Sequence, residues 1–165
     1  MRVPNDHALA VLSREVAERL LSAKRRLATA ESCTGGWIAK LCTDIAGSSD
    51  WFECGFVCYS NAAKTRDLGV PEKLIESEGA VSDAVVRAMA EGAIERTDAN
   101  VGIAVSGIAG PSGAVPGKPV GTVWLAWGGA GRIDAERLQL DGDRTAVRLA
   151  SVAAALRRLT AAATR

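Results

Sequence analysis

Apolar residues recur every three or four positions near the start of the chain, with charged residues between them. This spacing places one apolar stripe along a helix, so it predicts an amphipathic first helix. The stripe consists of Leu9, Leu12, Val16 and Leu20. A short apolar strand that includes Leu27 and Ala28 follows, and after Ala30 it gives way to small and hydroxyl residues.

The stretch from Thr29 to Trp37 marks a change from strand to helix, with Ser32 in the turn between them. The pattern predicts a helix from about Gly36 to Thr43. At such a junction backbone N–H groups lack partners and the helix dipole favours negative charge, which suits an oxyanion or a bound phosphate. The alternative is an ordinary hydroxyl N-cap whose glycines ease a tight turn.

The remaining elements follow from short apolar runs and from helix-capping residues. Asp50 with Glu53 three residues later resembles a capping box and indicates a short helix start. Residues 101–105 form a continuous apolar run, as expected for a strand covered on both faces, and a glycine-rich loop follows from Ser106. The other expected strands are 56–59, 120–127 and 132–140, and the last two form a hairpin. The other expected helices are 62–68, 71–79 and 145–162, together with one that Ser82 caps.

Helices alternate with strands along the chain, and one hairpin is embedded among them. This order predicts an α/β fold: a single three-layer α/β/α domain, covering residues 1–165, with a mixed sheet. Polar loops follow two apolar strands, one after Ala30 and one after Val105. Ligands bind outside the carboxyl ends of strands in open α/β sheets, so parallel neighbouring strands would bring both loops to one crevice.

The composition narrows the class of protein without naming a chemistry. The chain has 165 residues, of which 48% are hydrophobic and 24% charged, and this fits one globular domain. The formal net charge of +1 provides no basic field for nucleic acid, and no apolar run approaches the roughly 20 residues that span a bilayer. Residues 1–6 lack the apolar stretch of a signal peptide, so we expect a soluble cytoplasmic protein.

The four cysteines and the single histidine argue against a metal site. There is no Cys-x-x-Cys spacing, and His7 lies far upstream of every cysteine. The expected role of the cysteines is therefore that of small buried residues. Cys33 lies next to Ser32 and is the alternative nucleophile, although no second histidine is present to activate it.

Tyr59 and Lys64 form a second group of interest. Tyr59 is the only tyrosine of the chain and ends an expected strand, and Lys64 lies near the start of the next expected helix. A cation at a helix N-terminus is unfavourable, and this placement would lower the pKa of the lysine, as a lysine general base requires. The alternative is a surface lysine and a half-buried tyrosine.

Seven short motifs occur along the chain in one order. They are Glu31-Ser32-Cys33-Thr34-Gly35-Gly36, Gly47-Ser48-Ser49, Tyr59-Ser60-Asn61 with Lys64, Gly79-Ala80-Val81-Ser82, Ser106-Gly107-Ile108-Ala109-Gly110-Pro111, Lys118-Pro119-Val120-Gly121-Thr122-Val123 and Gly142-Asp143-Arg144. Together they resemble the CinA C-terminal domain family, whose stand-alone members are nicotinamide-nucleotide amidohydrolases (NMN deamidases). The resemblance extends from the first helix to the last. Larger members carry an additional N-terminal domain linked to pyrophosphatase activity, for which this chain is too short.

The resemblance implies hydrolysis of the carboxamide of nicotinamide mononucleotide (NMN) to nicotinate mononucleotide and ammonia, in pyridine nucleotide (NAD) recycling. It also implies a serine amidase with a lysine base, in which Ser32 is the nucleophile and Tyr59 and Lys64 are its activating partners. Backbone N–H groups around residues 34–36 would supply the oxyanion hole. We expect no cofactor and no metal, because a serine–lysine route needs no Lewis acid. We also expect a homo-oligomer that binds a small nucleotide and neither nucleic acid nor membrane.

A nucleotide substrate also needs donors for its phosphate. The expected substrate-binding residues are Thr34, Gly35, Gly36, Ser48, Asn61, Ser106, Gly107, Lys118 and Arg144. For Arg144 the alternative is a salt-bridged surface arginine beside Asp143, which would cap the last helix. For the whole chain, the alternatives are a nucleotide-binding module without catalysis and a role linked to competence or DNA damage, and the near-zero net charge argues against direct DNA binding.

Overall fold

Five strands form one sheet in the computed structural model, which describes residues 4–129 and 131–163. The order across the sheet is β2-β1-β3-β4-β5. β1 runs parallel to both of its neighbours, and β4 runs antiparallel to β3 and β5. The predicted mixed sheet is therefore confirmed. The strands are β1 (Leu27–Glu31), β2 (Phe52–Val57), β3 (Val101–Gly107), β4 (Thr122–Gly129) and β5 (Arg132–Gln139).

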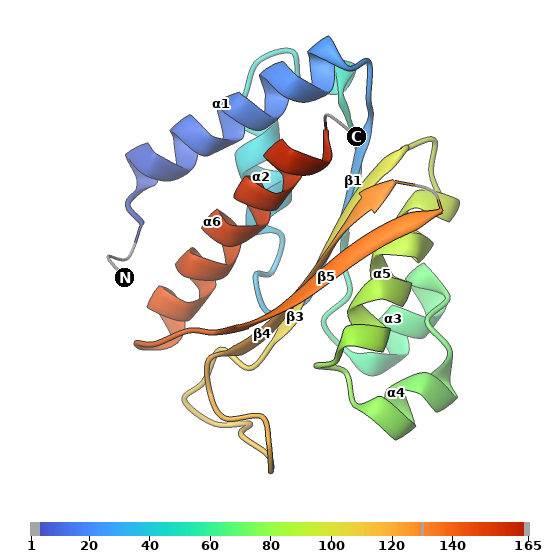
Figure 1. Cartoon of the computed structure of the whole chain (residues 1–165), viewed down its shortest axis with the longest axis vertical. Helices are drawn as coiled ribbons and strands as arrows, with labels where there is room; N and C mark the ends of the chain where they lie inside the picture. Colours follow the sequence, from blue (N-terminus) through green and yellow to red (C-terminus); the bar gives the residue numbers. More distant parts are fainter. Residues whose placement is uncertain (1–3, 130, 164–165) are drawn as a thin grey trace.

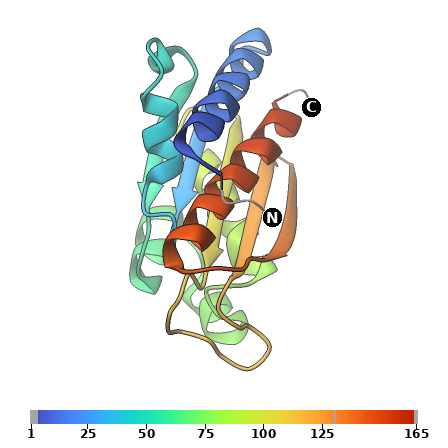
Figure 2. The ribbon, with the colours of Figure 1, turned by 90° about the vertical axis from the view of Figure 1, so that its left-hand side faces the viewer.

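Helices cover both faces of the sheet, as Figures 1 and 2 show. One face is covered by α1 (Asp6–Ser22), α2 (Trp37–Thr43) and α6 (Arg144–Ala162). The other face is covered by α3 (Asn61–Leu68), α4 (Glu72–Glu78) and α5 (Asp83–Glu95). This is the predicted three-layer α/β/α arrangement, and it separates the apolar core into two halves.

The apolar stripe of the first helix packs where its spacing predicts. Leu9, Val16 and Leu20 are buried between α1, α6 and the sheet, and Leu12 is half-buried at the margin. Removing a side chain of this size from water contributes roughly 1.5–3 kcal/mol. On the opposite face the core is built from α5 residues and from the small side chains Ala28 and Ala30 of β1.

A close backbone contact with α5 fixes the position of α3. A Cβ atom on Gly92 of α5 would lie 2.0 Å from the carbonyl oxygen of Leu68, so only glycine lets α5 approach the last turn of α3 so closely. The other end of α3 is capped by the Ser60 hydroxyl, which accepts from the Ala63 N–H. Gly69 ends the helix in the left-handed conformation.

The structure corrects three local predictions. β2 begins at Phe52 rather than at residue 56, so Glu53 is a strand residue that pairs with Arg26 and does not complete a capping box with Asp50. Pairing with β1 overrides the helical signal there. Ser106 and Gly107 belong to β3, where they pair with β4, and are not part of a loop. Pro71 precedes α4 as its N-cap instead of being its first residue.

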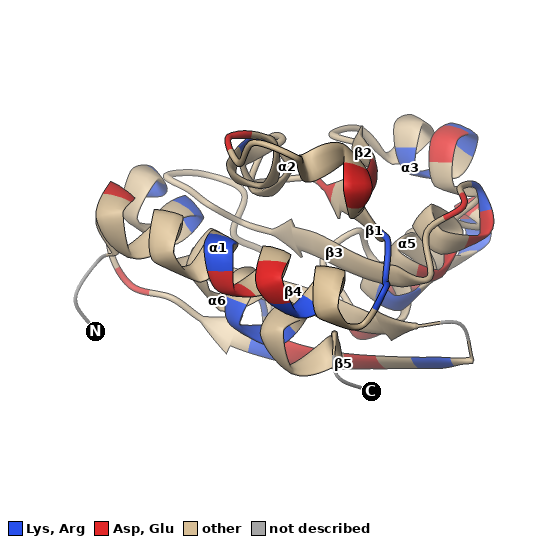
Figure 3. Ribbon diagram, turned by 90° about the horizontal axis from the view of Figure 1, so that it is seen from above, with Lys and Arg blue, Asp and Glu red and all other residues tan. Residues whose placement is uncertain are grey.

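Charges of both signs alternate along α1 and β5 (Figure 3), so neither element presents a surface of one sign. In the described residues, no helix is both long and apolar enough to cross a membrane.

Candidate active site

The turn with Ser32 leaves the sheet at the carboxyl end of β1, between its two parallel neighbours. The Ser32 N–H donates to the Val105 carbonyl of β3, and the Cys58 N–H, just beyond β2, donates to the Glu31 carbonyl. Side chains alternate between the faces of a strand. Glu31 accordingly points toward α2 and Ser32 toward the opposite layer, which carries α3.

Lys64 of α3 reaches the serine from that layer. Its Nζ atom lies 3.2 Å from Ser32 Oγ, 2.9 Å from the carbonyl oxygen of Cys58 and 3.3 Å from that of Tyr59. The lysine is only 1% exposed and the serine 9%. The candidate base and the candidate nucleophile are 32 residues apart in the sequence, and the fold brings them within hydrogen-bond distance.

The environment of Lys64 favours its neutral form. Burial lowers the pKa of the lysine from its usual value of 10.5. The described residues provide hydroxyl and carbonyl oxygens around Nζ but no carboxylate in an ion pair with it. Burial is the main cause of the lowered pKa, rather than the helix N-terminus that the position of Lys64 in the sequence suggests.

The N-terminus of α2 is already occupied, contrary to the expectation of a free anion site. The Glu31 carboxylate accepts from the Ile38 N–H at 3.0 Å and from the Ala39 N–H at 2.8 Å. Burial raises the pKa of this carboxyl, and the backbone hydrogen bonds from α2 oppose that shift. The Glu31 carboxyl therefore occupies the backbone N–H groups at the start of α2, and an oxyanion or phosphate would have to displace it there.

Only part of the turn can donate to a substrate. The Gly35 N–H donates to the Ser32 carbonyl at 3.0 Å, and the Gly36 N–H lies close enough to Glu31 to lower the pKa of that carboxyl. Among residues 34–36, the Thr34 N–H alone has no acceptor within the described part of the chain. Of the backbone N–H groups expected to form an oxyanion hole, the one at Thr34 therefore has no acceptor in the described residues.

Tyr59 contacts Lys64 through its backbone and not through its phenol. Tyr59 is 60% exposed, and its phenol oxygen accepts a hydrogen bond from Arg144 at 3.0 Å. Arg144 also donates to the Gly110 carbonyl at 2.9 Å. No described carboxylate forms an ion pair with Arg144, so the alternative of a salt-bridged surface arginine does not hold.

Arg148 is a site residue that the sequence did not suggest. It lies one helical turn after Arg144 and so on the same face of α6. Its guanidinium donates to the Cys33 carbonyl at 3.0 Å and to the Thr34 carbonyl at 3.1 Å, and it lies over the Trp37 ring. In the sequence, the four-residue spacing of Arg144 and Arg148 at the start of an expected helix indicates that both lie on one helix face.

Several predicted substrate-binding residues have other roles in the structure. Ser48 lies before β2, at the amino edge of the sheet, whereas Ser32 of the same chain lies at the carboxyl edge. Ser106 is buried, and its hydroxyl donates to the Ala80 carbonyl at 2.7 Å. Lys118 donates to the Glu78 carbonyl at 2.7 Å, and Asn61 lines a small hollow between α3 and α4.

The environment of Cys33 disfavours it as the nucleophile. The side chain is buried in the core under α2 and α6, and burial raises the pKa of its thiol to about 11. A thiol with so high a pKa holds almost no thiolate at neutral pH.

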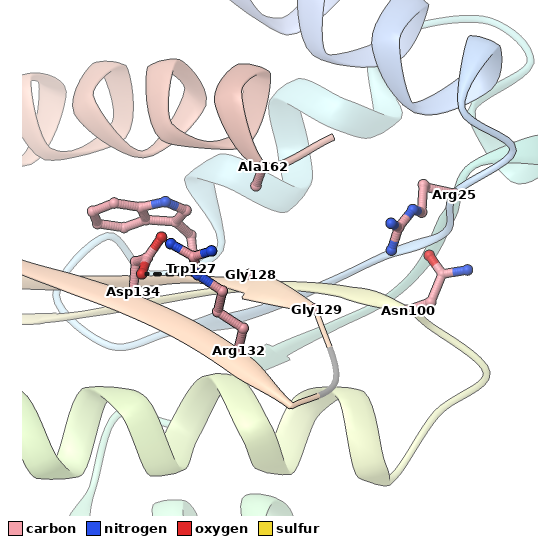
Figure 4. Close-up of a pocket in the computed structure, with 8 residues that line it drawn as sticks. All are labelled: Arg25, Asn100, Trp127, Gly128, Gly129, Arg132, Asp134 and Ala162. Carbon is pink, nitrogen blue, oxygen red and sulfur yellow. Dashed lines mark ion pairs between the residues drawn. The ribbon is translucent and has the colours of Figure 1, made fainter. Parts of the chain in front are cut away.

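One cavity adjoins the Ser32 turn, and another lies away from it. One of about 600 Å³ adjoins it and is lined by Thr34, Gly35, Gly36, Trp37 and Arg148 together with residues of α1 and α2. The other, of about 630 Å³, lies at the opposite edge of the sheet, beside the residues that precede β1 and β3 (Figure 4). It contains none of the residues around Ser32. Its labelled residues are Arg25, Asn100, Trp127, Gly128, Gly129, Arg132, Asp134 and Ala162.

The fold and the site together define a three-layer α/β domain with a buried lysine against a serine at a strand-to-helix turn. The model of the CinA C-terminal domain family matches residues 9–163. The chain belongs to the CinA C-terminal domain family.

Relatives and solved structures resemble the chain over nearly its whole length. The nicotinamide-nucleotide amidohydrolase PncC of Pseudomonas putida is 55% identical over 148 residues, which cover 90% of this chain and 92% of the relative. The protein of the same name from Escherichia coli (strain K12) is 50% identical over 155 residues, covering 93% and 94%. A crystal structure of the competence/damage inducible protein CihA from Agrobacterium tumefaciens has a TM-score of 0.92 and 40% identity, covering 100% of this chain and 99% of that one.

Proposed function

We propose that this chain, as one cytoplasmic amidohydrolase domain, converts NMN to nicotinate mononucleotide and ammonia in NAD recycling. The observation that carries the proposal is the buried contact of Lys64 Nζ with Ser32 Oγ at 3.2 Å. The names of the relatives from Pseudomonas putida and Escherichia coli support the substrate. The geometry supports the choice of nucleophile and base.

In the first step neutral Lys64 acts as the general base. Two of its N–H bonds donate to the carbonyls of Cys58 and Tyr59, so its lone pair faces the Ser32 hydroxyl. The lysine takes the hydroxyl proton while Oγ bonds to the carboxamide carbon, and the carbonyl electrons move to the oxygen. The Thr34 N–H donates to that oxyanion.

In the second step the tetrahedral intermediate collapses. The carbon–nitrogen bond breaks, the Lys64 ammonium returns its proton to the leaving nitrogen, and ammonia departs. Ser32 then holds the acyl group as an ester. A water molecule gives a proton to Lys64 and attacks the ester, and Ser32 leaves with the proton that the lysine returns, releasing nicotinate mononucleotide.

Arg144 is the proposed contact for the substrate phosphate. It extends from the first turn of α6 and is held by a phenol oxygen and a carbonyl, so its charge is not neutralised by a described carboxylate. A guanidinium binds phosphate through paired N–H donors. Tyr59, through its hydrogen bond to Arg144, would orient this side chain toward the substrate.

We expect the phosphate to contribute strongly to turnover. Nicotinamide riboside keeps the pyridinium ring and the ribose of NMN but lacks the phosphate, and it should show a kcat/KM lower by about 10²-fold. Free nicotinamide should be poorer still. Arg144→Met should lower kcat/KM for NMN and leave the riboside nearly unchanged. Equal kcat/KM values for the three substrates would mean that the loops hold no phosphate, and a nicotinamidase-like amidase would describe the protein better.

We also expect activity to survive removal of metals. The described residues contain no group of three or more His, Cys, Asp and Glu side chains that could hold a metal ion. Dialysis against a strong chelator should leave kcat on NMN unchanged. Loss of turnover that one divalent ion restores would contradict the serine–lysine mechanism proposed here.

The proposed function is tested by ammonia release from NMN, measured for the wild type and for Ser32→Ala at equal concentrations of folded protein. The wild type should release one ammonia for each nicotinate mononucleotide formed. Binding of NMN without ammonia release would favour the alternative of a nucleotide-binding module without catalysis.

A further inference from the structure

Arg148 joins α6 to the turn that follows Ser32. It donates through Nε to the Cys33 carbonyl at 3.0 Å and through a terminal nitrogen to the Thr34 carbonyl at 3.1 Å. Its guanidinium carbon lies 5.2 Å from the centre of the Trp37 ring. One side chain thus contacts two successive peptide groups of the turn and the first residue of α2.

These contacts fix the direction of a backbone donor. A peptide group is planar and trans, so its carbonyl and its N–H point in opposite directions. Because the Cys33 carbonyl faces Arg148, the N–H of Thr34, which belongs to the same peptide group, points away from α6. α3 and Lys64 lie on that side of the sheet.

The next peptide group is held in the same way. Its Thr34 carbonyl accepts from Arg148, and its Gly35 N–H closes the turn on the Ser32 carbonyl. The turn is therefore fixed from α6 through its carbonyls and locally through two backbone hydrogen bonds, the Gly35 N–H to the Ser32 carbonyl and the Trp37 N–H to the Thr34 carbonyl at 3.3 Å. The Thr34 N–H remains directed at the serine side with no described acceptor.

We propose that Arg148 is a positioning residue for the reaction: its guanidinium orients the Cys33–Thr34 peptide group so that the Thr34 N–H donates to the oxyanion formed at Ser32. This inference rests on the proposed function. Arg148 itself does not contact the reacting atoms, and Trp37 keeps the guanidinium in the plane that reaches both carbonyls.

The test compares four variants on NMN. Arg148→Met keeps the length of the side chain and loses both hydrogen bonds, and Arg148→Lys keeps the charge and loses the paired donors. Trp37→Phe keeps an aromatic ring beside the guanidinium. Arg157→Met removes an exposed arginine from the same helix and is the matched control. Thermal unfolding of each variant establishes that it is folded.

We expect Arg148→Met to lower kcat by on the order of 10²-fold, as loss of one oxyanion donor does, with KM changed by less than about threefold. Arg148→Lys should recover part of this loss, and Trp37→Phe should cost less than about tenfold. Arg157→Met should match the wild type.

A second measurement separates orientation of the donor from a general loss of structure. An NMN analogue with an aldehyde in place of the carboxamide would add to Ser32 and place an oxyanion in the hole, whereas nicotinate mononucleotide would not. Arg148→Met should weaken binding of the aldehyde by about the factor lost in kcat/KM and leave binding of nicotinate mononucleotide unchanged.

Two results would overturn the inference: a folded Arg148→Met enzyme with kcat near the wild-type value, or equal losses of affinity for both ligands. If Arg148→Met does not fold, full kcat in Arg148→Lys would overturn it instead. In each case an inactive Ser32→Ala would show that the proposed function itself still stands.

Discussion

Ser32→Ala is expected to fold as the wild type does and to release ammonia from NMN roughly 10⁴–10⁶-fold more slowly. The substitution removes a single oxygen that is 3.2 Å from Lys64 Nζ, at a position that is 9% exposed. Without this oxygen no acyl intermediate forms, and what remains is binding near the Thr34 N–H. Steady-state ammonia release with thermal unfolding as the control for folding measures the effect.

Ser77→Ala is the matched control for this variant. Ser77 is an exposed serine of α4 whose hydroxyl bonds within its own helix, so its loss should leave kcat unchanged. A folded Ser32→Ala protein that turns over NMN near the wild-type rate would place the nucleophile elsewhere.

The second large effect is expected at Lys64. Lys64→Met has a similar length but no proton acceptor, and Lys64→Arg keeps a charge that cannot be removed near neutral pH. Both should lower kcat/KM by at least about 10³-fold, because serine is a weak nucleophile until a base takes its proton. Efficient turnover by Lys64→Arg would mean that another group, such as Lys118 or a water, is the base.

The pH dependence of the wild type follows from the same lysine. The neutral form is the base, so kcat/KM should rise with pH through the pKa of Lys64, which burial lowers from 10.5. The folded protein binds its proton less tightly than the unfolded chain does. The unfolding free energy should therefore rise with pH between the lowered pKa and 10.5, relative to Lys64→Met, in which no such rise occurs.

The sequence predicted those parts of the site that local patterns determine. The small and hydroxyl residues after an apolar strand located the turn at Ser32, and the helix expected at residues 62–68 is the one that carries Lys64. Apolar runs gave the parallel strands whose carboxyl ends bring the two together.

The remaining features depend on contacts that no local pattern encodes. Arg148 reaches the turn across 115 and 114 residues of chain, and the sequence shows only that it lies on a helix. Glu31 stands out in the sequence only as part of a motif, because its capping of α2 depends on the face of the sheet toward which it points. The position of Ser48 also depends on the sheet, because its segment precedes β2 and the parallel register puts that segment at the amino edge.

The proposed mechanism requires that an acyl group forms on Ser32. The most direct measurement is rapid acid quenching of the wild-type enzyme with NMN during the first turnover, followed by mass analysis of its peptides. The peptide that contains Ser32 should transiently gain the mass of the nicotinate mononucleotide acyl group, and it should remain unmodified in Ser32→Ala. Ammonia released in the first turnover with that peptide unmodified at every quench time, or with the added mass on Cys33, would contradict the account.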